Sequence, residues 1–145
     1  MRVTDNCIEG LSGRYSLRGE VEIEGTVDGL TVLSQSLRTN TQEIKLPLRI
    51  LSTEDVRPYD WSISSIELQL SQGKVKIKIY REGDSLVISG ALKYMAALAD
   101  DVDFLVNQGL TNETQGVQHH SHIEFYEGHF WLDPESQAIV ITYLE

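Results

Sequence analysis

Two segments of the chain show alternating apolar and polar positions that lead up to a glycine. The matching positions lie 65 residues apart, with Tyr15, Val21, Ile23 and Gly25 followed later by Tyr80, Leu86, Ile88 and Gly90. Such alternation is typical of a half-buried β-strand. Glycine suits a sharp turn from a strand into a helix. We therefore expect each half of the chain to contain a strand that ends at a glycine turn.

An amphipathic helix is predicted after each glycine. Its apolar residues are spaced by three, three and four positions, as Val27, Leu30, Leu33 and Leu37 and then as Leu92, Met95, Leu98 and Val102. This spacing gives an α-helix one apolar face. We expect the second helix to run through Val106 and end at Gly109, with a mobile polar loop over 109–117. The constant offset predicts one compact domain, 1–145, with an internal duplication of about 1–72 and 73–145.

Further alternating segments predict more strands. These segments are 43–51, 62–70, 74–79 with a lysine face, 122–126 and 138–144. Many strands and two helices indicate the α+β class. We expect a mainly antiparallel sheet with two helices on one face, built from two tandem strand–helix–strand repeats.

Composition narrows the range of partners. The formal net charge is −10, and a surface of that sign repels nucleic-acid phosphates and anionic lipid headgroups. We therefore expect no nucleic-acid or membrane partner. A basic partner would be attracted, although an acidic surface can also serve solubility alone.

Cys7 is the single cysteine, so no internal disulfide is expected. The first six residues lack an apolar segment, which predicts no signal peptide and a cytoplasmic location.

All four histidines lie between residues 119 and 129. On a strand, His120, His122 and Glu124 would share one face, and His129 could join them from the following turn. Two imidazoles and a carboxylate can bind a metal ion. The alternative, which we favour, is that these are partly exposed strand and loop residues, with no metal and no cofactor.

No nucleophile-elbow, phosphate-loop or zinc-protease motif occurs in the sequence. We therefore expect the protein not to be an enzyme. Glu20, Glu22 and Glu24 alternate with apolar residues, which places three carboxylates on one outer face. They would either prevent pairing of exposed strand edges or form an acidic surface for a basic partner.

Large aromatic residues follow the histidine strand. Tyr126 and Trp131 have the character of interface anchors, although Trp131 would equally suit the core, since Trp61 lies before the corresponding last strand of the first half. The predicted partner-binding residues are His120, His122, Glu124, Tyr126, His129 and Trp131. The acidic surface of Glu20, Glu22 and Glu24 is the second choice.

The second half of the chain resembles the immunity protein 32 family of bacterial polymorphic-toxin systems. The similar segments are Leu86–Gly90 with the helix after it, His120–Tyr126, and Glu127–Ser136 with the strand 138–144, so that residues 74–145 are covered. Residues 1–70 depart from the family pattern and look like a second, diverged copy without the histidines. The resemblance implies a small non-enzymatic protein that neutralises a cognate toxin by binding it.

Three functions remain open at this stage. The first is an immunity protein that binds a protein toxin, with a basic nuclease as one candidate. The second is a metal- or small-ligand-binding protein that uses His120, His122, Glu124 and His129. The third is a structural or regulatory module that dimerises through a sheet edge. The sequence leaves a monomer and a homodimer equally open.

Overall fold

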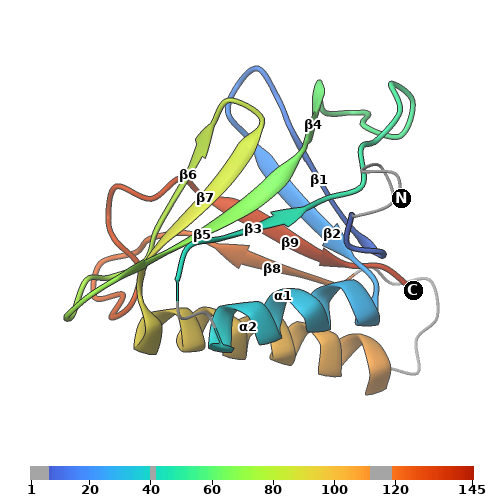
Figure 1. Cartoon of the computed structure of the whole chain (residues 1–145). Helices are drawn as coiled ribbons and strands as arrows, with labels where there is room; N and C mark the ends of the chain where they lie inside the picture. Colours follow the sequence, from blue (N-terminus) through green and yellow to red (C-terminus); the bar gives the residue numbers. More distant parts are fainter. Residues whose placement is uncertain (1–6, 40–41, 112–118) are drawn as a thin grey trace.

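The structure is a computed structural model that describes residues 7–39, 42–111 and 119–145. Within these residues the chain forms two helices and nine strands (Figure 1), which confirms the α+β class. In chain order they are β1 (Leu11–Tyr15), β2 (Val21–Gly25), α1 (Val27–Thr39), β3 (Ile44–Pro47), β4 (Trp61–Ile63), β5 (Ser65–Ser71), β6 (Lys78–Glu82), β7 (Ser85–Ala91), α2 (Leu92–Thr111), β8 (His119–Ile123) and β9 (Ile139–Tyr143).

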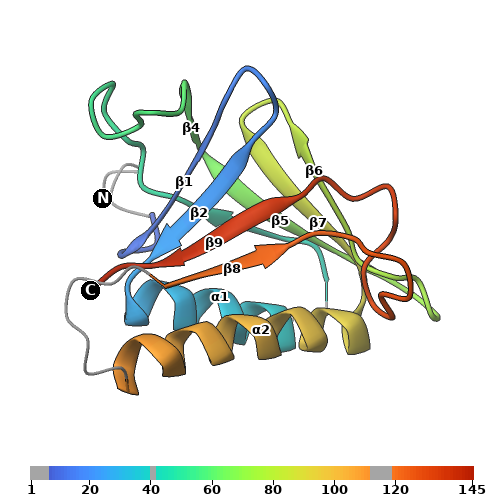
Figure 2. The same ribbon diagram turned by 180° about the vertical axis from the view of Figure 1, so that it is seen from behind.

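The strands form two sheets instead of the single sheet that the sequence pattern predicts. The five-stranded sheet has the order β4-β1-β2-β9-β8, and the four-stranded sheet has the order β3-β5-β7-β6. Neighbouring strands are antiparallel except for two parallel pairs, β2 with β9 and β5 with β7. The helices lie side by side beneath both sheets (Figures 1 and 2). Apolar alternation identifies a strand but does not reveal its partner, so the division into two sheets was not predictable from it.

Each half of the chain contributes strands to both sheets. The β1–β2 hairpin pairs through β2 with β9, and the β6–β7 hairpin pairs through β7 with β5. Outside the strands, Ile8 bridges to Leu48 and Ile77 bridges to Leu132. The four strands β1-β2-β9-β8 of the five-stranded sheet therefore have the same sequence of pairing types as the four-stranded sheet, and β4 is an additional edge strand. Whether this reflects an internal duplication remains a hypothesis.

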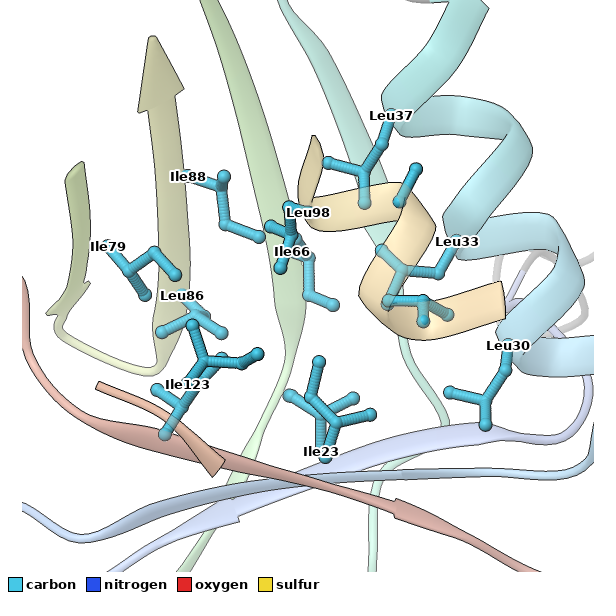
Figure 3. Close-up of a cluster of buried hydrophobic side chains, with 14 of the residues drawn as sticks. Ile23, Leu30, Leu33, Leu37, Ile66, Ile79, Leu86, Ile88, Leu98 and Ile123 are labelled. Atoms are coloured by element: carbon cyan, nitrogen blue, oxygen red, sulfur yellow. The ribbon is translucent and has the colours of Figure 1, made fainter. Parts of the chain in front are cut away.

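The core lies between the two sheets and the helices. It receives Leu30, Leu33 and Leu37 from α1, Leu98 from α2, and isoleucines from both sheets (Figure 3). The helical stripes predicted from the spacing are buried except at their first positions. Val27 is half-buried, and Leu92 is 40% exposed because it begins α2 at the end of the sheet. Among the described residues, no helix is long and apolar enough to cross a membrane.

Polar side chains also join the helices. The Arg38 guanidinium contacts the Asp100 carboxylate at 2.7 Å and the Asp103 carboxylate at 2.5 Å. The Ser34 hydroxyl donates a hydrogen bond to Asp103 at 2.5 Å. Ser34 is paired with Asp103, whereas Arg38, one turn later in α1, also reaches Asp100, which is earlier in α2. The two helices therefore run antiparallel. These aspartates therefore join α2 to α1 as well as facing solvent.

Two glycines have a packing role that differs from the one expected. Gly25 does not have a positive φ, and a Cβ at this position would lie 2.7 Å from a carbon of Leu30. Gly109 does not end α2, which continues to Thr111. A Cβ on Gly109 would lie 2.4 Å from the ring of Tyr143. Both glycines thus make room for a neighbouring side chain. Of the predicted loop 109–117, residues 112–117 lie outside the described residues.

Two strand boundaries differ from the predictions. β8 begins at His119, earlier than the predicted 122–126, so Glu124 and Tyr126 follow the strand. β6 begins only at Lys78, although alternation starts at Lys74. Before it, the Ile77 amide donates a hydrogen bond to the Trp131 carbonyl, and the Ile77 carbonyl accepts one from the Asp133 amide. The segment 131–133 is thus the partner of this part of the chain.

Candidate functional site

The exterior of the five-stranded sheet brings the two predicted surfaces together. On the central strand β9, Val140 has His122 of β8 on one side and Glu22 of β2 on the other. Thr142 likewise has His120 on one side and Glu24 on the other. Buried isoleucines alternate with these positions along β2, β8 and β9, so the polar members face away from the core. We call this surface the outer sheet face, with the residues Arg14, Glu20, Glu22, Glu24, His120, His122, Glu124, Val140 and Thr142. A single strand, β9, separates His120 and His122 on β8 from Glu22 and Glu24 on β2.

A hydrogen-bonded chain of side chains crosses this face. The Arg14 Nε donates to Glu22 Oε1 at 2.8 Å, and the Thr142 hydroxyl donates to Glu22 Oε2 at 2.6 Å. His120 Nδ1 lies 3.4 Å from Thr142 Oγ1. Because the Thr142 hydroxyl proton is used toward Glu22, its oxygen acts as the acceptor toward the imidazole. The chain therefore links β1, β2, β9 and β8.

Burial distinguishes the three glutamates that were predicted to form one exposed surface. Glu22 is only 8% exposed, Thr142 is fully buried, and Glu24 is half-buried, whereas Glu20 is exposed. The Glu22 carboxylate is paired with Arg14 and satisfied by Thr142, so its role in the free protein is structural. Glu20 is left as the accessible member of the three.

The outer sheet face has a negative electrostatic character. The pKa of the Glu24 carboxyl is raised, first by burial and then by the neighbouring Glu22 carboxylate, against the opposing effect of Arg14 and Arg49. The pKa of the Tyr59 hydroxyl is raised as well, first by burial and then by Glu22. Burial is thus the main cause of both shifts, and the Glu22 carboxylate adds to each of them.

A groove of about 160 Å³ opens on this face. The described residues that line it are Glu20, Val21, Tyr59, His122, Glu124, Ala138, Ile139 and Val140. Because β9 runs between β2 and β8, the small side chains Ala138 and Val140 leave a depression between Glu20 on one side and His122 with Glu124 on the other. Sequence reasoning missed Tyr59, which comes from the loop before β4 and carries no local signal of this position.

The turn after β8 differs from the expected accessible loop. His129 is 7% exposed and Trp131 is 6% exposed, so both are interior residues in the free protein, while Tyr126 is 63% exposed. The His129 ring lies 4.6 Å from the rings of both Tyr126 and Trp131, measured between centroids. Its Nδ1 accepts a hydrogen bond from the Leu132 amide at 3.3 Å. The alternative in which Trp131 packs in the core is the one observed.

Burial also sets the ionisation of His129. The pKa of its imidazole is lowered because burial disfavours the charged ring and Lys76 repels it, although Asp101 acts in the opposite direction. His120 and His122 lie instead on the outer sheet face, with ring centroids 6.2 Å apart. In the part of the chain that the structure describes, no group of three His, Cys, Asp or Glu residues is placed to hold a metal ion. The proposed four-residue metal set is not brought together.

Comparison with known proteins bears on the second half of this architecture. The family model for immunity protein 32 matches residues 85–144. The matched segment runs from β7 to β9 and includes α2, β8 and the His122 and Glu124 side of the groove. It lies within the range 74–145 over which the sequence resembles that family, and it supports an immunity role. A comparison with curated proteins found no match.

Proposed function

We propose that this chain is an immunity protein that neutralises a protein toxin by binding it directly and without catalysis. The match of residues 85–144 to the immunity protein 32 family is the observation that carries the proposal. The matched half supplies β8 and β9, the strands that bear the histidines and the floor of the groove. The first half supplies Glu20 and Tyr59 on the other side.

The outer sheet face is the surface that we assign to the toxin. His122, Glu124 and Glu20 are exposed there, and Tyr126 is exposed on the adjoining turn. The net charge of −10 favours a toxin with a basic surface, since unlike charges accelerate encounter and fix orientation. A nuclease, which needs a basic cleft for phosphates, is the candidate that this charge favours most.

His129 and Trp131 have a supporting role in this proposal. Their rings are packed together and buried, so they hold the turn that presents Tyr126. Contact with the toxin is assigned to the exposed residues His120, His122, Glu124 and Tyr126.

The test is co-expression with a candidate toxin chosen from the genes that flank this one. The wild-type chain should restore growth of cells that produce the toxin and should co-purify with it. A His122→Ala/Glu124→Gln variant should bind more weakly, by about tenfold for a lost contact of some 1.4 kcal/mol. The matched control is Glu82→Gln, an exposed glutamate on β6 in the other sheet. If Glu82→Gln abolished protection and the double variant did not, the interface would lie on the four-stranded sheet instead. Protection without any detectable complex would overturn direct binding.

A further inference from the structure

The groove on the outer sheet face is charged on two sides and apolar at its base. Its described lining contains the carboxylates Glu20 and Glu124 and no lysine or arginine. Ala138 and Val140 form an apolar base between them. The volume of about 160 Å³ is well below the roughly 300–1,000 Å³ typical of small-molecule sites. A single long cationic side chain fits this combination better than a separate small-molecule ligand.

The two carboxylates differ in their existing partners. Glu20 accepts a hydrogen bond from the Ser16 hydroxyl at 3.2 Å. For Glu124, the described residues provide neither a hydrogen bond nor an ion pair, and its side chain is exposed at the end of β8. Its acceptor oxygens are therefore available to an incoming donor.

Beside the groove, the chain already binds one of its own arginines, Arg14, with an aromatic ring and a carboxylate. The Arg14 guanidinium lies 4.6 Å from the centroid of the Tyr59 ring, and it donates to the Glu22 carboxylate. An aromatic face and a carboxylate together suit a guanidinium, which is planar, weakly hydrated and able to form paired hydrogen bonds. Tyr59 also lines the groove, where Glu124 and Glu20 supply the carboxylates.

We propose that this groove is a specificity pocket that receives an arginine side chain of the bound toxin. The assignment rests on the proposed function and deepens it, because it names the chemical group by which the toxin is recognised. The arginine would lie over Ala138 and Val140, with its guanidinium between Glu124 and Glu20 and beside Tyr59. A lysine would form fewer of these contacts, since it offers no planar group to stack.

The pocket can be tested on the full chain without the toxin. The probe is N-acetyl-arginine methylamide, titrated into isotopically labelled protein and followed by amide chemical shifts. The control probe is N-acetyl-citrulline methylamide, which has nearly the same shape but no charge. The arginine probe should bind with a Kd on the order of millimolar and shift the amides of His122, Glu124 and Val140. The citrulline probe should leave them in place.

Two variants distinguish binding in the groove from a general attraction of the cationic probe to the acidic protein. Glu124→Gln should weaken arginine-probe binding by about tenfold, as expected for the loss of one charge-assisted hydrogen bond. Glu82→Gln carries the same change in net charge on the opposite sheet and should leave binding unchanged. Equal shifts with the citrulline probe, shifts that map away from the groove, or an equal effect of both variants would each overturn the pocket.

Failure of the pocket and failure of the proposed immunity function give different results. Probe binding at the groove, with no protection against any candidate toxin, would support an arginine-binding groove and overturn the immunity role. Protection by the wild-type chain, with no binding of the arginine probe, would retain the immunity role and overturn the pocket.

Discussion

The Thr142 hydroxyl donates a hydrogen bond to the Glu22 carboxylate at 2.6 Å, although the two residues are 120 positions apart in the chain. Glu22 is 8% exposed and Thr142 is fully buried. The bond fixes β9 against β2, and through Arg14 and His120 it extends over the outer sheet face. The same bond thus stabilises the fold and positions the candidate site.

Removing the Thr142 hydroxyl should destabilise the protein. Thr142→Val keeps the shape of the side chain but leaves Glu22 Oε2 without this donor, at an expected cost of about 1–3 kcal/mol. Urea denaturation followed by circular dichroism measures the change in the free energy of unfolding. Thr53→Val, on an exposed loop residue, is the matched control and should change stability by less than about 0.5 kcal/mol. Equal stability of the two variants would show that the buried bond contributes nothing.

Buried His129 should make stability dependent on pH. Its pKa is lowered in the folded protein, so the unfolded chain binds a proton more readily. The contribution to stability is therefore complete above the unfolded pKa of about 6.5, and it decreases as the pH falls from there toward the lowered folded pKa. His129→Gln should remove this part of the pH dependence. Unfolding free energies measured between about pH 7 and pH 5 test it, and an unchanged slope in the variant would contradict it.

Asp101 and Glu24 change stability with pH in the opposite sense. The pKa of each carboxyl is raised by burial in the folded state, so the folded protein takes up these protons first. Above the raised pKa, ionisation of these buried carboxyls lowers the free energy of unfolding. This loss is relieved as the pH falls toward about 4, the pKa of a carboxyl in the unfolded chain. The effect of His129 is therefore best read on the neutral side of this pH range.

The helical stripes should carry much of the stability. Leu33→Ala and Leu98→Ala each remove a fully buried side chain from the core, and each should cost about 2–5 kcal/mol. Val32, the neighbour of Leu33 on α1, points to solvent and provides the control. Val32→Ala should change the free energy of unfolding by less than about 0.5 kcal/mol. Similar losses for Val32 and Leu33 would contradict the observed helix orientation.

Gly109 provides a test in which packing and helix propensity predict opposite signs. Replacing glycine by alanine within an unconstrained helix stabilises it by up to about 1 kcal/mol. At Gly109 the added methyl group would lie 2.4 Å from the Tyr143 ring, so Gly109→Ala should destabilise the protein. Asn107→Ala, at an exposed position of α2, should be neutral or slightly stabilising. A higher thermal midpoint for Gly109→Ala would show that α2 does not pack closely on β9.

The hypothesis of an internal duplication predicts how half of the chain behaves. A fragment of residues 73–145 lacks β2 and β5, the parallel partners of β9 and β7. If the halves are related, two fragments can supply these partners to each other, with β7 of one copy beside β9 of the other. The fragment should then fold only as a dimer, as measured by light scattering and circular dichroism. A folded monomer, or a fragment that stays unfolded at high concentration, would contradict the hypothesis.

Local periodicity was sufficient to predict the helices but not the assembly of the sheets. The spacing of Leu30, Leu33 and Leu37 predicts which face of α1 is buried, because neighbours on a helix are close in sequence. The sequence placed His122 and Glu22 on separate surfaces, whereas the register across β9 puts them on one. His129 was predicted to be an exposed turn residue, whereas the structure buries it against the Trp131 ring. Pairings between distant strands and the depth of a turn are tertiary properties that a local pattern does not contain.

The parallel pairing of β2 with β9 has a consequence for synthesis on the ribosome. β2 is complete by residue 25, but the strand beside it is made of residues 139–143, which follow only after both helices and six further strands. Throughout translation the emerging β1–β2 hairpin has one unpaired strand edge, and such edges favour association with other chains. We expect the acidic side chains Glu22 and Glu24 on that strand to oppose such association until β9 has been made.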